Sequence, residues 1–325
     1  MRSQLLVFLG LASALLPRGA SAQQQAAEAR AAAEGVEPRF VGDWAYVPVT
    51  VVQGPYVTSF ASSTTAVGAA TLDLEFDFPH TTGARTRNLD YTALLQRFEG
   101  QLGLLRRFAI RANLQGEAVV PNDGGAALSV ALNGEWSAGG GVVAQLLHTD
   151  RARFALTGDY RFRSRRVVSP AGAIEQTADE RRLGRLLTEQ EIHSASAAGS
   201  FALRLADWLG VVAEAGWQSD WQQAVGVFRG QKEHLHFLNL AGAVGANFWQ
   251  RQVPLGVTAF WRERVPLGDS PFDSSRQFGG GVFYTGRPYL DLGVEIFDQR
   301  DVQRAGNFVR DAERLYVAPR IRGYF

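Results

Sequence analysis

Three observations predict an all-β fold, a transmembrane antiparallel up-and-down β-barrel. First, the 325 residues are 46 % hydrophobic, yet their mean hydropathy is −0.10, as in barrels whose strands alternate apolar and polar residues. Second, many alternating segments reach about ten residues, the length that a tilted strand needs to cross a bilayer. Third, short and long connections between these segments alternate, as in outer-membrane barrels. No segment after the N-terminus has 18 consecutive apolar residues, so no transmembrane helix is expected there.

The first residues predict export. Arg2 gives a positive start, residues 5–16 form an apolar run, and small residues precede a cleavage site after Ala22. The run is shorter than the roughly 20 residues that a membrane-spanning helix needs. We therefore predict a signal peptide over 1–22. Its removal takes away Arg2 and Arg18 and leaves 31 basic and 32 acidic side chains, a balance that gives no reason to expect a nucleic-acid partner.

The next segment, 23–70, differs from the barrel predicted over 71–325. Residues 23–35 are rich in alanine and predict a short helix. Residues 36–70 leave two alternatives open. They form either a plug that enters the lumen and narrows it, or a linker followed by the first barrel strands.

The alternation predicts 12 strands, with 14 possible, and even numbers are the rule for single-chain bacterial barrels. The twelve expected strands cover 90–102, 105–120, 126–138, 140–148, 152–163, 199–206, 209–221, 234–248, 253–264, 276–286, 288–298 and 313–325. Segments 56–65 and 71–79 would complete fourteen. A barrel of this size lies between the filled interior of eight strands and the open channel of 16.

The connections are expected to divide the barrel into two ends. Short turns are predicted at 148–152, 206–209, 249–252 and 286–289, and longer outer loops at 164–198, 222–234, 265–275 and 298–312. Aromatic residues near the strand ends predict two girdles at the level of the lipid headgroups. They are Trp208, Trp249, Tyr289 and Tyr324 on the short-turn side and Trp136, Phe162, Trp221, Trp261 and Phe297 on the long-loop side.

One long loop also contains a helix signal. Thr177 and Glu180 form a capping box, and Leu183, Leu186 and Leu187 follow at helical spacing. This helix either folds inward as a constriction or packs on the surface of its own strands.

The C-terminal strand alternates and ends on an aromatic residue, Phe325. Val317 and Ile321 occupy apolar positions before it, whereas Pro319 and Gly323 depart from the pattern. This ending resembles the C-terminal signature of bacterial outer-membrane β-barrel proteins. The resemblance implies an outer membrane of the Gram-negative type and contact with its lipid and lipopolysaccharide. It also implies that the barrel-assembly machinery reads Phe325 as an assembly signal.

The polar face of the strands predicts a charged lumen. The candidate lumen-lining and selectivity residues are Arg107, Arg111, Arg153, Arg161, Arg163, Arg204, Arg262, Arg320, Arg322, Glu117, Glu135, Asp159, Glu214, Asp220, Asp291 and Glu295, together with Arg97 and Glu99. Opposed charges in a water-filled pore select ions as rings of charge do, and the planar arginine fork binds carboxylates at two points. The alternative is a network of salt bridges that fills a narrow barrel.

These features predict a channel or transporter for passive passage of small polar solutes, anionic ones among them. The alternatives are a hydrophobic-compound transporter with an N-terminal plug, a lipid-modifying enzyme and a closed structural barrel. An enzyme is not expected. His193 is the only histidine close to serines in the sequence, Ser194 and Ser196, and no G-x-S-x-G motif accompanies it. The pair His234 and His236 is a weak metal signal without a third ligand. No cysteine is present, and no cofactor or metal is expected.

Overall fold

Twelve strands form the structure, a computed structural model. It describes residues 57, 59–76, 85–121, 134–149, 151–168, 187–206, 208–225, 232–248, 253–268, 272–287, 290–305 and 308–325. The strands are β1 (Phe60–Phe76), β2 (Arg85–Leu105), β3 (Phe108–Pro121), β4 (Gly134–His148), β5 (Ala152–Val168), β6 (Leu187–Ala206), β7 (Leu209–Val225), β8 (Lys232–Asn247), β9 (Leu255–Leu267), β10 (Phe272–Arg287), β11 (Leu290–Ala305) and β12 (Phe308–Tyr324). The predicted signal peptide over 1–22 and the alanine-rich segment 23–35 lie outside these residues.

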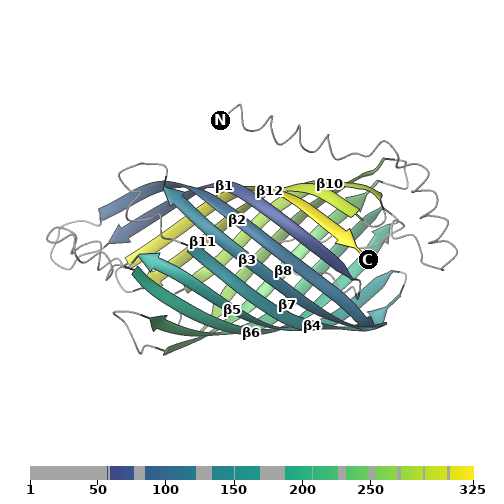
Figure 1. Ribbon diagram of the computed structural model, residues 1–325, viewed down its shortest axis with the longest axis horizontal. Helices are drawn as coiled ribbons and strands as arrows, with labels where there is room; N and C mark the ends of the chain where they lie inside the picture. Colours follow the sequence, from purple (N-terminus) through teal and green to yellow (C-terminus); the bar gives the residue numbers. More distant parts are fainter. Residues whose placement is uncertain are drawn as a thin grey trace. The chain divides into compact units, whose positions relative to one another are not determined.

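All neighbouring strands pair antiparallel in chain order, and β1 closes the barrel by pairing with both β2 and β12. Figure 1 shows the strands tilted across the barrel wall. Phe60 on β1 lies opposite Gln101 on β2 and Tyr324 on β12. Closure leaves no sheet edge, so backbone donors and acceptors are satisfied between strands without help from water. This is the predicted up-and-down barrel.

The outer surface of the barrel is apolar. On β11, for example, Leu292, Val294 and Ile296 are 37 %, 46 % and 53 % exposed, whereas the intervening Glu295 is fully buried. The strands contain 13 to 21 residues, more than the roughly ten that cross a bilayer. The architecture is therefore that of an outer-membrane-type barrel whose strands extend beyond the lipid. Among the described residues, no helix is long and apolar enough to span a membrane.

The number of strands was predicted correctly, but two strand assignments were wrong. Residues 134–138 and the segment 140–148 belong to a single strand, β4 (Gly134–His148), and residues 126–133 lie outside the described residues. Of the segments 56–65 and 71–79, residues 60–65 and 71–76 belong to one strand, β1. The first barrel strand thus begins at Phe60, before the boundary expected at 71. Glycines 139–141, at the break predicted after residue 138, lie within the ladder because their missing side chains leave room for neighbouring strands.

The loops are shorter than predicted because the strands extend beyond the apolar belt. The expected long loop at 298–312 is wrong, since β11 continues to Ala305 and β12 begins at Phe308. Arg300 bonds Asp311 across these two strands, with 2.5 Å between Nη2 and Oδ2. Polar residues on both faces erase the alternation where a strand lies in water. Of the predicted loop helix at 177–187, only Leu187 is described, and it begins β6.

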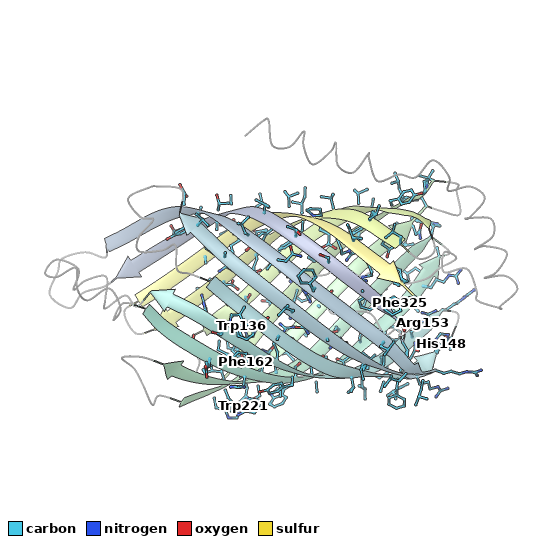
Figure 2. The ribbon with its side chains drawn as sticks, viewed as in Figure 1. Trp136, His148, Arg153, Phe162, Trp221 and Phe325 are labelled. Carbon is cyan, nitrogen blue, oxygen red and sulfur yellow. The ribbon has the colours of Figure 1, made fainter. Side chains whose placement is uncertain are left out.

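The two ends of the barrel differ in their connections. The short-turn end carries the turns after β2, β4, β6, β8 and β10, and the loop end carries the other connections. In Figure 2, Trp136, Phe162 and Trp221 lie toward the loop end, and His148, Arg153 and Phe325 toward the short-turn end. Phe297, expected in the outer girdle, instead points inward and is 2 % exposed.

Candidate functional site in the lumen

The structure places the candidate lumen residues, with one exception, on the strand face opposite the exposed apolar side chains. The exception is Arg107, which is exposed in the turn between β2 and β3 and lies outside the lumen. It was included because the alternating strand predicted over 105–120 was extended into the turn that precedes Phe108. The inward-facing residues divide into a filled short-turn half and two cavities above it.

Buried ion pairs fill the short-turn half of the lumen. Arg320 on β12 lies 3.1 Å from Glu295 on β11, and neither side chain has any exposed surface. Arg322 lies 3.8 Å from Glu99 on β2, and both are nearly buried. The guanidinium of Arg320 also stacks 4.6 Å above the centre of the Phe283 ring. Side chains therefore close this half, as in the salt-bridge network that the sequence left as an alternative.

A glycine allows an ion pair to form across a strand. Arg111 on β3 and Asp159 on β5 both lie opposite Gly141 on the intervening β4. The Arg111 guanidinium donates two hydrogen bonds to the Asp159 carboxylate over this glycine, one of them 2.5 Å from Nε to Oδ1. A Cβ added at Gly141 would overlap the Asp159 carboxylate and the Gly158 carbonyl oxygen. Only glycine leaves room for the pair.

We expect Gly141→Leu to break the Arg111–Asp159 pair. The substitution should lower the free energy of unfolding by about 3–5 kcal/mol, as expected when a partly buried charge pair loses its geometry. Reversible unfolding in denaturant measures this change. Gly116→Leu is the matched control, because a Cβ there meets nothing within 4 Å, and it should change stability by less than about 1 kcal/mol. Equal effects at the two positions would contradict this role of Gly141.

A cavity of about 280 Å³, the outer cavity, occupies the loop half of the lumen and carries an excess of positive charge. Its described charged lining residues are Arg97, Arg161, Arg163, Arg165, Arg262, Arg264, Arg276, Arg314, Glu117, Glu135, Asp220 and Asp301. These are eight arginines against four carboxylates. Several are paired, for example Arg314 with Asp301 at 2.7 Å and Arg163 with Glu135 at 3.2 Å. Arg97 and Arg276 also pair with carboxylates outside this lining, Glu99 and Glu263, and the smaller excess that remains favours anions in this outer cavity.

A smaller inner cavity of about 90 Å³ lies next to the outer one. Arg97 on β2, Arg161 on β5 and Arg262 on β9 line both cavities. These three arginines, the arginine ring, come from well-separated strands and mark the junction of the two cavities. Sequence reasoning found its members but not their association, because only closure of the barrel brings β2, β5 and β9 around one point.

Some lining residues were not among the candidates. Arg165 and Asp301 lie in segments that were predicted to be loops, yet they continue the inward face of β5 and β11. Ser194, on β6 opposite Arg161, lines the inner cavity with its hydroxyl buried. The alternation of β6, read back from Arg204 through every second residue, was the available signal for Ser194.

The histidines considered for chemistry lie on the outer face. His234 and His236 stack on Trp221 and Trp217, with ring centroids 5.2 and 5.4 Å apart. Ser219 and His234 share a hydrogen bond of 2.6 Å, which sequence reasoning missed because the two lie on paired strands. Ser219 is fully buried. Among the described residues, no group of three potential metal ligands occurs.

His193 also lies on the outer face. It shares a 2.6 Å hydrogen bond with the hydroxyl of Tyr160 and packs its ring against Phe162, 5.1 Å between centroids. Its neighbours in sequence, Ser194 and Ser196, point the other way into the lumen. The proximity of His193 to these serines in the sequence therefore does not place them together in space.

Comparison with known proteins gives fold-level likeness only. No family model and no curated protein sequence matches the chain. Among solved structures, it is similar to the translocator domain of the autotransporter NalP from Neisseria meningitidis (9 % identity, 92 % of this chain and 95 % of that one, TM-score 0.44). It is also similar to a Pseudomonas aeruginosa FadL homologue (11 %, 87 % and 96 %, 0.45) and to the Ralstonia pickettii toluene transporter TbuX (11 %, 88 % and 97 %, 0.39). Likenesses this distant transfer no substrate to this chain, and the barrel assignment stands on the strand pairing.

Proposed function

We propose that this chain is an outer-membrane channel or transporter that admits small polar solutes and favours anions. The observation that carries the proposal is the excess of arginine over carboxylate in the outer cavity. Charge of one sign in a recess with low-dielectric walls raises the local concentration of ions of the opposite sign. The arginine ring continues this positive potential to the inner cavity.

Passage requires movement in the short-turn half. The pair Arg320 and Glu295 has no exposed surface, so a solute crosses this level only when such pairs rearrange. We therefore expect intermittent currents rather than the steady conductance of a wide pore.

Reconstitution into planar bilayers under a salt gradient tests the proposal. We expect intermittent currents whose reversal potential shows preference for chloride over potassium. Arg163→Gln should reduce that preference, because it removes a charge from the outer cavity. Arg300→Gln is the matched control, since Arg300 is 57 % exposed and pairs with Asp311 outside the lumen. Absence of conductance above background, or preference for cations, would overturn the proposal.

A second candidate function is transport of a hydrophobic compound. It is favoured by an apolar crevice of about 620 Å³ in the wall near β2, β3 and β4. Outward-facing Leu94 and Trp136 line it together with inward-facing Leu95 and Glu117, and the last two also line the outer cavity. An apolar molecule bound to the purified barrel, in native mass spectrometry, without anion preference in bilayers would favour this candidate.

The cellular context is also part of the proposal. We infer that the chain is exported to an outer membrane of the Gram-negative type and contacts its lipid and lipopolysaccharide. Phe325 is 78 % exposed, and its backbone N–H donates to the carbonyl oxygen of Ser59, at 3.3 Å. Such an exposed terminal ring is accessible to an assembly factor. Deleting Phe325 should lower the amount of folded barrel in outer-membrane fractions, without preventing refolding in detergent.

A further inference from the structure

Arg161 differs from the other charged residues at the junction of the two cavities. Arg97 forms an ion pair with Glu99, Arg111 holds Asp159, and Arg262 interacts electrostatically with Glu214. Toward the other described residues, Arg161 makes no hydrogen bond or ion pair. It is partly exposed to the lumen.

The groups around Arg161 carry more positive than negative charge. The charged groups that interact with it are three arginines, Arg97, Arg163 and Arg262, and one carboxylate, Asp159, which Arg111 already holds. Along the inner cavity, four arginines face three carboxylates. One positive charge is therefore left without a counterion among the described lining residues, and a single monovalent anion would balance it.

A second group points to the same ligand. Ser194 lies directly opposite Arg161 across β5 and β6, a separation at which side chains meet. Ser194 is 4 % exposed, and its hydroxyl has no hydrogen-bond partner among the described residues. A buried hydroxyl without a partner costs free energy, and an oxygen atom of a bound anion would accept its hydrogen bond. Both groups line the inner cavity.

We propose that the inner cavity binds one small carboxylate, held by Arg161 and Ser194. The proposal rests on the anion preference proposed above and names the class of anion. A guanidinium offers two parallel N–H groups that match the two oxygens of a carboxylate, whereas a halide uses only one point of contact. The inner cavity, of about 90 Å³, has room for a molecule as small as acetate.

On the side of Arg161 away from Ser194, the paired residue on the neighbouring strand β4 is Gly139. A Cβ at this position would lie 2.9 Å from the Tyr160 carbonyl oxygen and 3.2 Å from Oδ1 of Asn113. The glycine therefore leaves the flank of Arg161 without a competing side chain. Asn113 lines the same cavity on the far side of Gly139. The polar side chains on either side of Arg161 along the cavity wall are therefore Ser194 on β6 and, beyond Gly139, Asn113 on β3.

Isothermal titration calorimetry on the full chain refolded in detergent tests the site, with sodium acetate, chloride and phosphate at equal ionic strength. We expect acetate to bind more tightly than chloride or phosphate. Arg161→Gln should weaken acetate binding by roughly tenfold or more, and Ser194→Ala by roughly three- to tenfold, because each removes a hydrogen bond to a charged group. Arg300→Gln, on the outer face, should leave acetate binding unchanged.

The outcomes separate this site from the proposed function. Equal binding of acetate and chloride, tighter binding of phosphate, or unchanged acetate binding in both variants would overturn the carboxylate site. If Arg161→Gln does not fold, Ser194→Ala, which loses only a hydroxyl, still decides. Acetate binding without bilayer currents would contradict the channel and leave the site standing. Anion-selective currents without acetate binding would contradict the site alone.

Discussion

Replacing Glu295 with alanine should lower the free energy of unfolding by about 3–5 kcal/mol, which is the usual cost of leaving one partner of a buried ion pair alone. Glu295 and Arg320 have no exposed surface and lie 3.1 Å apart. Without the carboxylate, the guanidinium keeps the cost of its lost hydration but loses its main counter-charge. Equilibrium unfolding of the refolded barrel in denaturant measures the change.

Two further variants make this prediction specific. Asp311→Ala removes the partner of Arg300, which is 57 % exposed, and should cost less than about 1 kcal/mol because water replaces the ion pair. The double variant Glu295→Leu with Arg320→Met removes both charges and should recover most of the lost stability. A single Glu295→Ala variant that is as stable as Asp311→Ala would show that water reaches this level of the lumen.

Replacing Val294 with arginine should destabilise the barrel in lipid vesicles by about 2–4 kcal/mol, the cost of arginine on the lipid face at the middle of a bilayer. Val294 lies on the outer face between Leu292 and Ile296, and its partners on the neighbouring strands are Val282 and Pro319. An arginine there must enter hydrocarbon or distort the bilayer to reach water. Folding titrations into vesicles measure the difference.

The matched control is Leu105→Arg, at the turn between β2 and β3. Leu105 is 68 % exposed, but it lies at the short-turn end of the wall, where the cost should fall to about 0–1 kcal/mol. Equal costs at the two positions would show that Val294 is not at the centre of a bilayer. The difference in cost between the two variants therefore reports how deep each position lies in the bilayer, because both variants introduce the same arginine.

Most of the wall was predictable from local periodicity. A strand with one face in lipid and one in the lumen alternates residue by residue, as Leu292, Val294 and Ile296 do around Glu295. Where both faces are polar, as around Arg300 and Asp311, the pattern disappears and the strand ends were placed too early. The break predicted between 126–138 and 140–148 falls at Gly139, and a glycine within a ladder looks the same in sequence as one in a turn.

The inward aromatic residues were harder to predict. Phe297 lies on the lumen face and packs against Tyr316, with ring centroids 5.0 Å apart. An aromatic residue near a strand end can belong to an outward girdle or to the lumen. Its side is decided by whether it alternates with the outward-facing residues of β11. The predicted strand 288–298 contained this parity, because Phe297 directly follows Ile296, but the assignment to a girdle used only its place near the strand end.

By itself, the sequence determined the fold class, the even number of strands and the charged character of the interior, because alternation is a property of each strand alone. Only the tertiary structure decided which charges meet. The hydroxyl of Tyr316 donates to Glu117 at 3.1 Å across 199 positions of the chain, and the arginine ring joins β2, β5 and β9. Such contacts depend on the register and closure of twelve strands, which leave Arg161 without a counterion while its neighbours are paired.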